Sequence, residues 1–218
     1  MYIEFDIPEF TQDLSGFLRY WFPTLFGQSV FRRYEVLALS NNYVRLVDSA
    51  IFEYGAGTYQ LKKFWSGDGG VSLGAFHQAV SHFEICITNT HRATKLFRRL
   101  RRDRQRGQLA RTLSDKSLAA SFATDEANKI LRDIRNDIHH IDDAVLKRAI
   151  LPGQPFSIKP DGPEMPHSTE PNQTIKTIDR LIVGARELRF VTLNKWLSEM
   201  TGVVGIIADL VAASESLD

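Results

Sequence analysis

The sequence predicts an all-α protein: a bundle of about four main helices with extra helices at its N- and C-terminal ends. Two long segments carry apolar residues at steps of three and four, as the buried face of a helix requires. No stretch of any length alternates apolar and polar residues like a half-buried strand, and no fixed-period repeat occurs. With 218 residues, 43% of them apolar, the chain is long enough to bury one large core.

The first part of the chain is rich in aromatic residues and is interrupted by prolines. Residues 1–30 are predicted to form an arm with one short amphipathic helix from about Pro8 to Phe22. The arm would pack on a larger helical domain that spans residues 31–218. Residues 31–55 show a loose helical period, and the glycines between Gly55 and Gly70 then predict a loop.

The two clearest helices begin at residues suited to capping. Ser72 precedes a long predicted helix that continues through Leu100, and Thr124 or Asp125 can cap the next one. The apolar stripe of the first helix is Leu73, Phe76, Val80, Phe83 and Ile87. The stripe of the second is Ile130, Ile134, Ile138, Ile141 and Val145, which lie within about 40° of one line along the helix.

The C-terminal third begins with a Pro/Gly-rich segment, residues 151–172, which is predicted to be a loop with room for one short hairpin arm. From Ile175, apolar residues again recur at steps of three and four. They predict a last helical region to about Met200, a break at Gly202 and a terminal helix over residues 203–211.

The charge of the chain is unevenly distributed. The total is +1, but the segment from Arg92 to Arg111 holds nine basic residues and one acidic residue, a net +8. The remaining 18 basic and 26 − 1 = 25 acidic residues leave the rest at −7. Arginine dominates the segment, and its planar guanidinium suits bidentate phosphate contacts. A nucleic acid is therefore a plausible partner, although Phe97 is the one aromatic residue in the segment and base stacking is not specifically indicated.

The composition also indicates the cellular compartment of the protein. One cysteine, Cys86, cannot form an intramolecular disulfide, and no CxxC pair suggests a zinc site. The N-terminal residues lack the basic and apolar regions of a signal peptide, and no apolar run is long enough to span a bilayer. We therefore expect a cytoplasmic protein with no membrane partner.

The second capped helix carries the residues that could perform chemistry. Arg135, Asn136, His139 and His140 form a continuous polar arc between about 100° and 240° from the apolar stripe. An imidazole can take and return a proton at neutral pH, and a guanidinium can hold a phosphate and offset developing charge. These groups suffice for metal-free RNA cleavage, in which the 2′-hydroxyl attacks the adjacent phosphate.

The spacing of these residues also predicts a dimer. Arg135 and His140 point about 140° apart on one helix, so they cannot easily converge on one phosphate from a single copy. Two copies packed across a two-fold axis would bring both sets to one cleft.

The polar residues of this helix resemble the motif of a known family. Arg135-Asn136-x3-His140, on a late helix of an α-bundle, resembles the R-polar-x3-H motif of HEPN domains. The resemblance implies an up-and-down helical bundle that commonly homodimerises, with the motifs of both copies lining a composite cleft. Many members are metal-independent endoribonucleases that act as toxins, antiviral effectors or RNA processors.

Carried over to this chain, the resemblance makes Arg135 and His140 the catalytic pair and Asn136 their polar support, while His139 falls at a variable position. The expected function is that of a metal-independent endoribonuclease acting in bacterial toxin or antiviral defence. The expected partners are RNA, a second copy of the chain, and an antitoxin or another defence-system protein. No cofactor and no metal are expected.

Other interpretations fit the same residues. Some HEPN proteins are inactive scaffolds that bind RNA, a nucleotide or a protein, and a helical adaptor without a nucleic-acid role is a further alternative. The polar arc could be a solvated face with Asp137, Asp142 and Asp143 as ion-pair partners, and the basic segment a solvated helix end. His139 and His140 could bind a metal, but neighbouring residues on a helix point about 100° apart and no second ligand cluster is evident.

Overall fold

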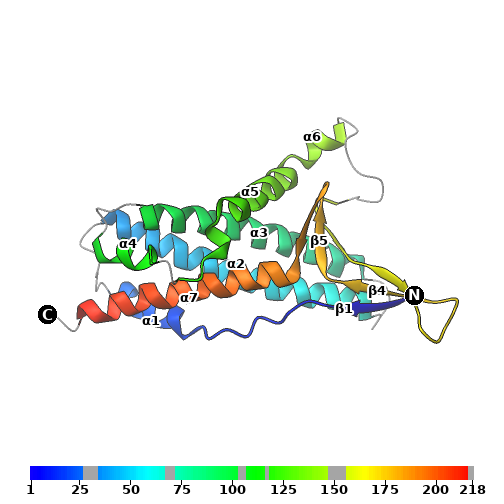
Figure 1. Cartoon of the computed structure of the whole chain (residues 1–218), viewed down its shortest axis with the longest axis horizontal. Helices are drawn as coiled ribbons and strands as arrows, with labels where there is room; N and C mark the ends of the chain where they lie inside the picture. The colour runs from blue at the N-terminus through cyan, green and yellow to red at the C-terminus, as the bar shows by residue number, and fades with distance from the viewer. Residues whose placement is uncertain (27–33, 67–71, 103–106, 116–117, 147–155, 216–218) are drawn as a thin grey trace. The chain divides into compact units, whose positions relative to one another are not determined.

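A computed structural model gives a protein that is mostly helical but also contains two small three-stranded sheets (Figure 1). It describes residues 1–26, 34–66, 72–102, 107–115, 118–146 and 156–215. The chain forms two compact units. We call them the sheet unit (Met1–Phe10, Phe52–Ile87 and Arg132–Lys195) and the helical unit (Thr11–Ile51, Thr88–Leu131 and Trp196–Asp218). The prediction that the chain is mostly helical is thus confirmed, and the prediction of a purely helical protein is wrong.

The helices, in chain order, are α1 (Ser15–Leu25), α2 (Tyr34–Ser66), α3 (Leu73–Arg102), α4 (Gly107–Leu113), α5 (Asp125–His139), α6 (Ile141–Leu146) and α7 (Phe190–Glu215). The strands are β1 (Tyr2–Phe5), β2 (Lys159–Asp161), β3 (Glu164–Pro166), β4 (Thr174–Ile178), β5 (Arg180–Val183) and β6 (Arg186–Arg189). A 3₁₀ turn at Ser121–Ala123 precedes α5. Among these elements, α2, α3, α5 and α7 each contribute residues to both units.

Both predicted helix caps are confirmed. The Ser72 hydroxyl accepts a hydrogen bond from the Ala75 N–H at 3.3 Å, and the Thr124 hydroxyl accepts one from the Ala127 N–H at 3.1 Å. Each bond satisfies a donor that the first turn of a helix would otherwise leave unpaired. Helix α3 also continues through Leu100, as its stripe predicts.

The helical unit is held by contacts that join α1, α2, α3 and α7. The Tyr43 hydroxyl of α2 donates to the Met200 carbonyl of α7 at 3.2 Å, and its ring lies 6.3 Å from that of Phe97 in α3. A Cβ on Gly16 would lie 3.2 Å from the Gly205 Cα, so α1 runs against the last part of α7 (Figure 1). These aromatic and close backbone contacts build the core of the unit.

The sheet unit contains both sheets, ordered β1-β4-β3 and β2-β5-β6. Strand β1, blue in Figure 1, pairs in parallel with β4 and aligns Tyr2 with Ile175, while the remaining pairs are antiparallel. Strands β5 and β6 form a hairpin whose turn holds Gly184 at a φ of +58°, a conformation that favours glycine.

The prediction of a helix over residues 175–188 is wrong, because this segment forms β4, β5 and β6. Its apolar residues occur at steps of three and four, but many are β-branched, and Leu181, Val183 and Leu188 alternate as the buried residues of the hairpin. The 151–172 segment, predicted as a loop with room for a hairpin arm, contains the short strands β2 and β3 among its described residues.

Three helix boundaries also differ from the predictions. The first helix begins at Ser15 rather than Pro8, and α2 continues through Gly55 and Gly57, where a loop was predicted. Helix α7 passes through Gly202 without a break. Glycine costs a helix about 1 kcal/mol relative to alanine. Burial of apolar neighbours offsets this cost, as for Val203, Val204 and Ile207 beside Gly202.

Candidate functional site

The predicted catalytic residues lie where α5 ends. Helix α5 buries Ala127, Leu131, Ile134 and Ile138. Of the other predicted stripe residues, Ile130 and Ile141 are half-buried, and the side chain of Val145 lies outside the described residues. It ends at His139, and α6 begins at Ile141, so the helix predicted to run through Val145 is interrupted at His140. The His140 N–H still bonds to the Asn136 carbonyl at 2.9 Å. The helical geometry therefore holds up to His140, and the angle of about 140° from Arg135 applies.

Arg135 and Asn136 are half-buried and contact each other. The Arg135 Nη1 donates to the Asn136 Oδ1 at 3.2 Å. Asn136 was predicted to be the polar support of Arg135 and His140, and its oxygen accepts this bond from the Arg135 guanidinium. Among the described interactions no hydrogen bond joins Arg135 to His140, and the polar arc therefore has two separate parts within one copy.

His140 is open to solvent. Its side chain is 68% exposed, and its Nδ1 lies 3.4 Å from the Asp143 Oδ2. A carboxylate at this distance can orient the imidazole ring. The neighbouring His139 is also exposed.

The acidic residues of α5 have partners outside the motif. Asp137 is bonded to Arg186 at the start of β6, and Arg186 also lies 4.0 Å from Asp133. Among the described ion pairs, Asp137 contacts Arg186 and neither Arg135 nor His140. Asp143 does contact His140, and the side chain of Asp142 lies outside the described residues.

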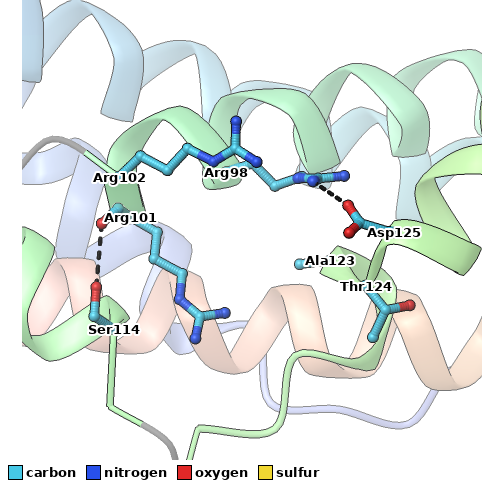
Figure 2. A pocket seen from close by; sticks show the side chains of 7 residues that line it. All are labelled: Arg98, Arg101, Arg102, Ser114, Ala123, Thr124 and Asp125. Atoms are coloured by element: carbon cyan, nitrogen blue, oxygen red, sulfur yellow. Dashed lines mark hydrogen bonds and ion pairs between the residues drawn. The ribbon is translucent and has the colours of Figure 1, made fainter.

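The basic segment provides two hollows, both in the helical unit. The larger, of about 580 Å³, lies between the end of α3 and the start of α5 (Figure 2). Its lining is Arg98, Arg101, Arg102, Ser114, Ala123, Thr124 and Asp125. The smaller, of about 290 Å³, is lined by Asn42, Leu46, Arg92, Lys95, Leu96 and Arg99. Arg104 and Arg106 lie outside the described residues.

Sequence patterns did not reveal all the residues at these places. Thr124 was predicted only as a helix cap, and Ser114 and Asn42 carried no signal, because their positions depend on how the helices pack. The motif residues Arg135, Asn136 and His140 line neither of the two hollows.

Two features are absent from the part of the chain that the structure describes. No group of three or more His, Cys, Asp or Glu side chains there is arranged to hold a metal ion. None of the helices described is both long and apolar enough to cross a bilayer.

Comparison of the chain with profiles of known protein families, with curated proteins and with solved structures gives no match to any of them. The resemblance to HEPN domains therefore depends on the motif and on the helical character of the chain.

Proposed function

We propose that this protein is a HEPN-like, metal-independent endoribonuclease that cleaves RNA at a site shared by two copies of the chain. The observation that carries the proposal is the motif Arg135-Asn136-x3-His140 at the end of α5, with an exposed His140 imidazole beside the Asp143 carboxylate. An exposed imidazole next to a carboxylate is suited to move a proton to and from a bound substrate.

The proposed reaction uses the RNA's own nucleophile. One imidazole removes the proton of a 2′-hydroxyl, whose oxygen attacks the adjacent phosphorus. The bond from phosphorus to the 5′-oxygen breaks, and the same imidazole, now protonated, donates that proton to the leaving oxygen. The products are a 2′,3′-cyclic phosphate and a 5′-hydroxyl. Arg135, oriented by Asn136, offsets the negative charge that develops on the phosphate oxygens.

In this proposal, a second copy of the chain brings Arg135 and His140 to the same phosphate. Because Arg135 and His140 project about 140° apart, a phosphate held by one would lie away from the other in a single copy. Across a two-fold axis, Arg135 of one copy and His140 of the other would face the same phosphate. Bacterial toxin or antiviral defence is the setting we propose for such an enzyme.

Cleavage of single-stranded RNA in the presence of EDTA tests the proposed activity. We expect the wild-type protein to release fragments with cyclic phosphate ends and to leave a 2′-O-methyl RNA of the same sequence intact. His140→Ala and Arg135→Ala should each lower the rate by at least about 100-fold, the usual contribution of an acid–base group. His139→Ala is the matched control, since it removes the neighbouring exposed imidazole, and should change the rate less than about threefold. Equal rates for wild type and His140→Ala would rule the enzyme out, and salt-dependent binding without cleavage would indicate an RNA-binding scaffold.

Mixing the two inactive variants tests the shared site. When Arg135→Ala and His140→Ala chains exchange subunits, about half of the dimers are mixed, and each mixed dimer has one site with both residues intact. About a quarter of the wild-type rate should therefore return. A mixture as inactive as its components would contradict the shared site, and sedimentation confirms that both variants remain dimers.

A further inference from the structure

The end of α3 presents a row of arginines to the larger hollow. Arg98, Arg101 and Arg102 are spaced i, i+3 and i+4, so their side chains leave the same face of the helix. All three line the hollow; Ser114 lies beside the Arg101 backbone, and Ala123, Thr124 and Asp125 line the other side at the start of α5 (Figure 2). The whole arrangement lies within the helical unit.

Positive charge exceeds negative charge in this hollow. The lining includes three guanidinium groups and one carboxylate, that of Asp125, which is bonded to Arg98 (Figure 2). Asp125 is 92% exposed, whereas Arg98 is 20% exposed. Among the described ion pairs none involves Arg101 or Arg102, and like charges on one helix face repel one another. A bound anion would relieve this repulsion.

The remaining polar groups of the wall are already used within the protein. The Ser114 hydroxyl donates to the Arg101 carbonyl at 3.1 Å. The Thr124 hydroxyl caps α5 and donates to the Ser121 carbonyl at 3.1 Å. The guanidinium groups are therefore the main donors for a ligand. No aromatic side chain belongs to the described lining, so the hollow suits phosphates rather than bases.

The smaller hollow extends the basic surface along the same helix. Arg92, Lys95 and Arg99 line it, and at 100° per residue they adjoin the arc of the three arginines. Together the six cations cover about half of the helix circumference, over about 15 Å between Arg92 and Arg102. We call these six residues the α3 cation face: Arg92, Lys95, Arg98, Arg99, Arg101 and Arg102. Two basic hollows on one helix suit an extended polyanion better than a single small anion.

We infer that the α3 cation face binds the phosphate backbone of an RNA strand, with the Arg98–Arg101–Arg102 hollow as its main phosphate site and with little preference for base identity. The choice of RNA rests on the proposed function. Binding at this face is a separate property from cleavage at His140, because the two sets of residues share no member.

Fluorescence anisotropy with labelled 20-residue oligo(U) and oligo(A) RNA tests this inference. The full-length His140→Ala protein is the parent, so that the probe stays intact. If all six cations contact phosphates, a plot of log affinity against log salt has a slope of about −4. The double variant Arg101→Ala/Arg102→Ala should weaken binding at least about tenfold at 0.1 M salt and reduce the slope by about 1.4.

The matched control is Arg19→Ala/Arg45→Ala, which removes two exposed arginines of the same unit that lie outside the basic segment and line neither hollow. It should weaken binding less than about threefold, and oligo(U) and oligo(A) should bind within about threefold of each other. Circular dichroism confirms that each variant folds. Equal losses in the two double variants would overturn the inference. The inference would also be overturned if ATP or tripolyphosphate binding depended on Arg101 and Arg102 while RNA binding did not.

Failure of this inference is distinguishable from failure of the proposed function. If wild-type protein cleaves RNA through His140 but binding does not depend on Arg101 and Arg102, the α3 cation face is not the RNA site and the enzyme remains. If these arginines are required for RNA binding but no RNA is cleaved, the RNA-binding site is supported and the proposed endoribonuclease activity is refuted.

Discussion

Replacing Asp161 with asparagine tests how the two sheets are joined. The Asp161 carboxylate of β2 accepts hydrogen bonds from Lys159 at 2.7 Å, from Lys176 of β4 at 2.5 Å and from the Gly162 N–H at 2.9 Å. Since β2 and β4 belong to different sheets, this carboxylate links them. Its side chain is only 12% exposed, so solvent screens these interactions little.

The pKa of Asp161 gives the size of the expected effect. Burial by itself would raise the pKa, but the hydrogen bonds from Lys159, Lys176 and Gly162 outweigh it and lower the pKa from 3.8 to about 2. At 1.36 kcal/mol per pKa unit, the ionised carboxylate stabilises the folded protein by about 2 kcal/mol. Because the folded state has the lower pKa, this stability is complete above about pH 5 and is lost as the pH falls from about 4 to 2.

Urea denaturation of wild type and Asp161→Asn measures the difference directly. We expect the variant to be less stable by about 2 kcal/mol at pH 7 and pH 5, and by about 1 kcal/mol at pH 3. The control is Asp209→Asn, whose carboxylate is 64% exposed and bonded to Arg19, and which should cost less than about 0.5 kcal/mol. A difference at pH 7 no larger than that of the control, or one that does not shrink at pH 3, would refute this account of Asp161.

Two further predictions concern helix packing and capping. A Cβ on Gly57 would lie 2.9 Å from the buried Phe83 ring, whereas one on Gly55 would meet nothing within 4 Å. Gly55→Ala should therefore stabilise α2 by up to about 1 kcal/mol, and Gly57→Ala should be about 1–3 kcal/mol less stable than Gly55→Ala by thermal denaturation; equal melting temperatures would contradict the close contact. Thr124→Ala removes the cap of the Ala127 N–H and should cost about 1 kcal/mol, while Thr124→Ser should cost much less; equal losses in the two variants would show that the hydroxyl is not the stabilising group.

The candidate site shows which features of this protein can be predicted locally. Thr124 and the stripe of α5 placed Arg135, Asn136 and His140 on a helix, because caps and i, i+4 spacing act within a few residues. The pairing of Asp137 with Arg186 could not be predicted in this way, since it depends on the β5–β6 hairpin lying against α5. The end of α5 at His139 could likewise not be predicted from the apolar pattern, which continues to Val145.

The sequence by itself determined the helical character of most of the chain, the capped starts of α3 and α5, the basic segment and the motif of Arg135, Asn136 and His140. These features depend on near neighbours along the chain. Only the tertiary structure decided that residues 174–189 form strands, because β1 pairs with β4 across more than 160 residues of sequence. The tertiary structure also decided that Arg98, Arg101 and Arg102 face a common hollow, because Ser114 and the start of α5 complete its lining. Helical periodicity cannot specify a partner surface that another part of the chain supplies.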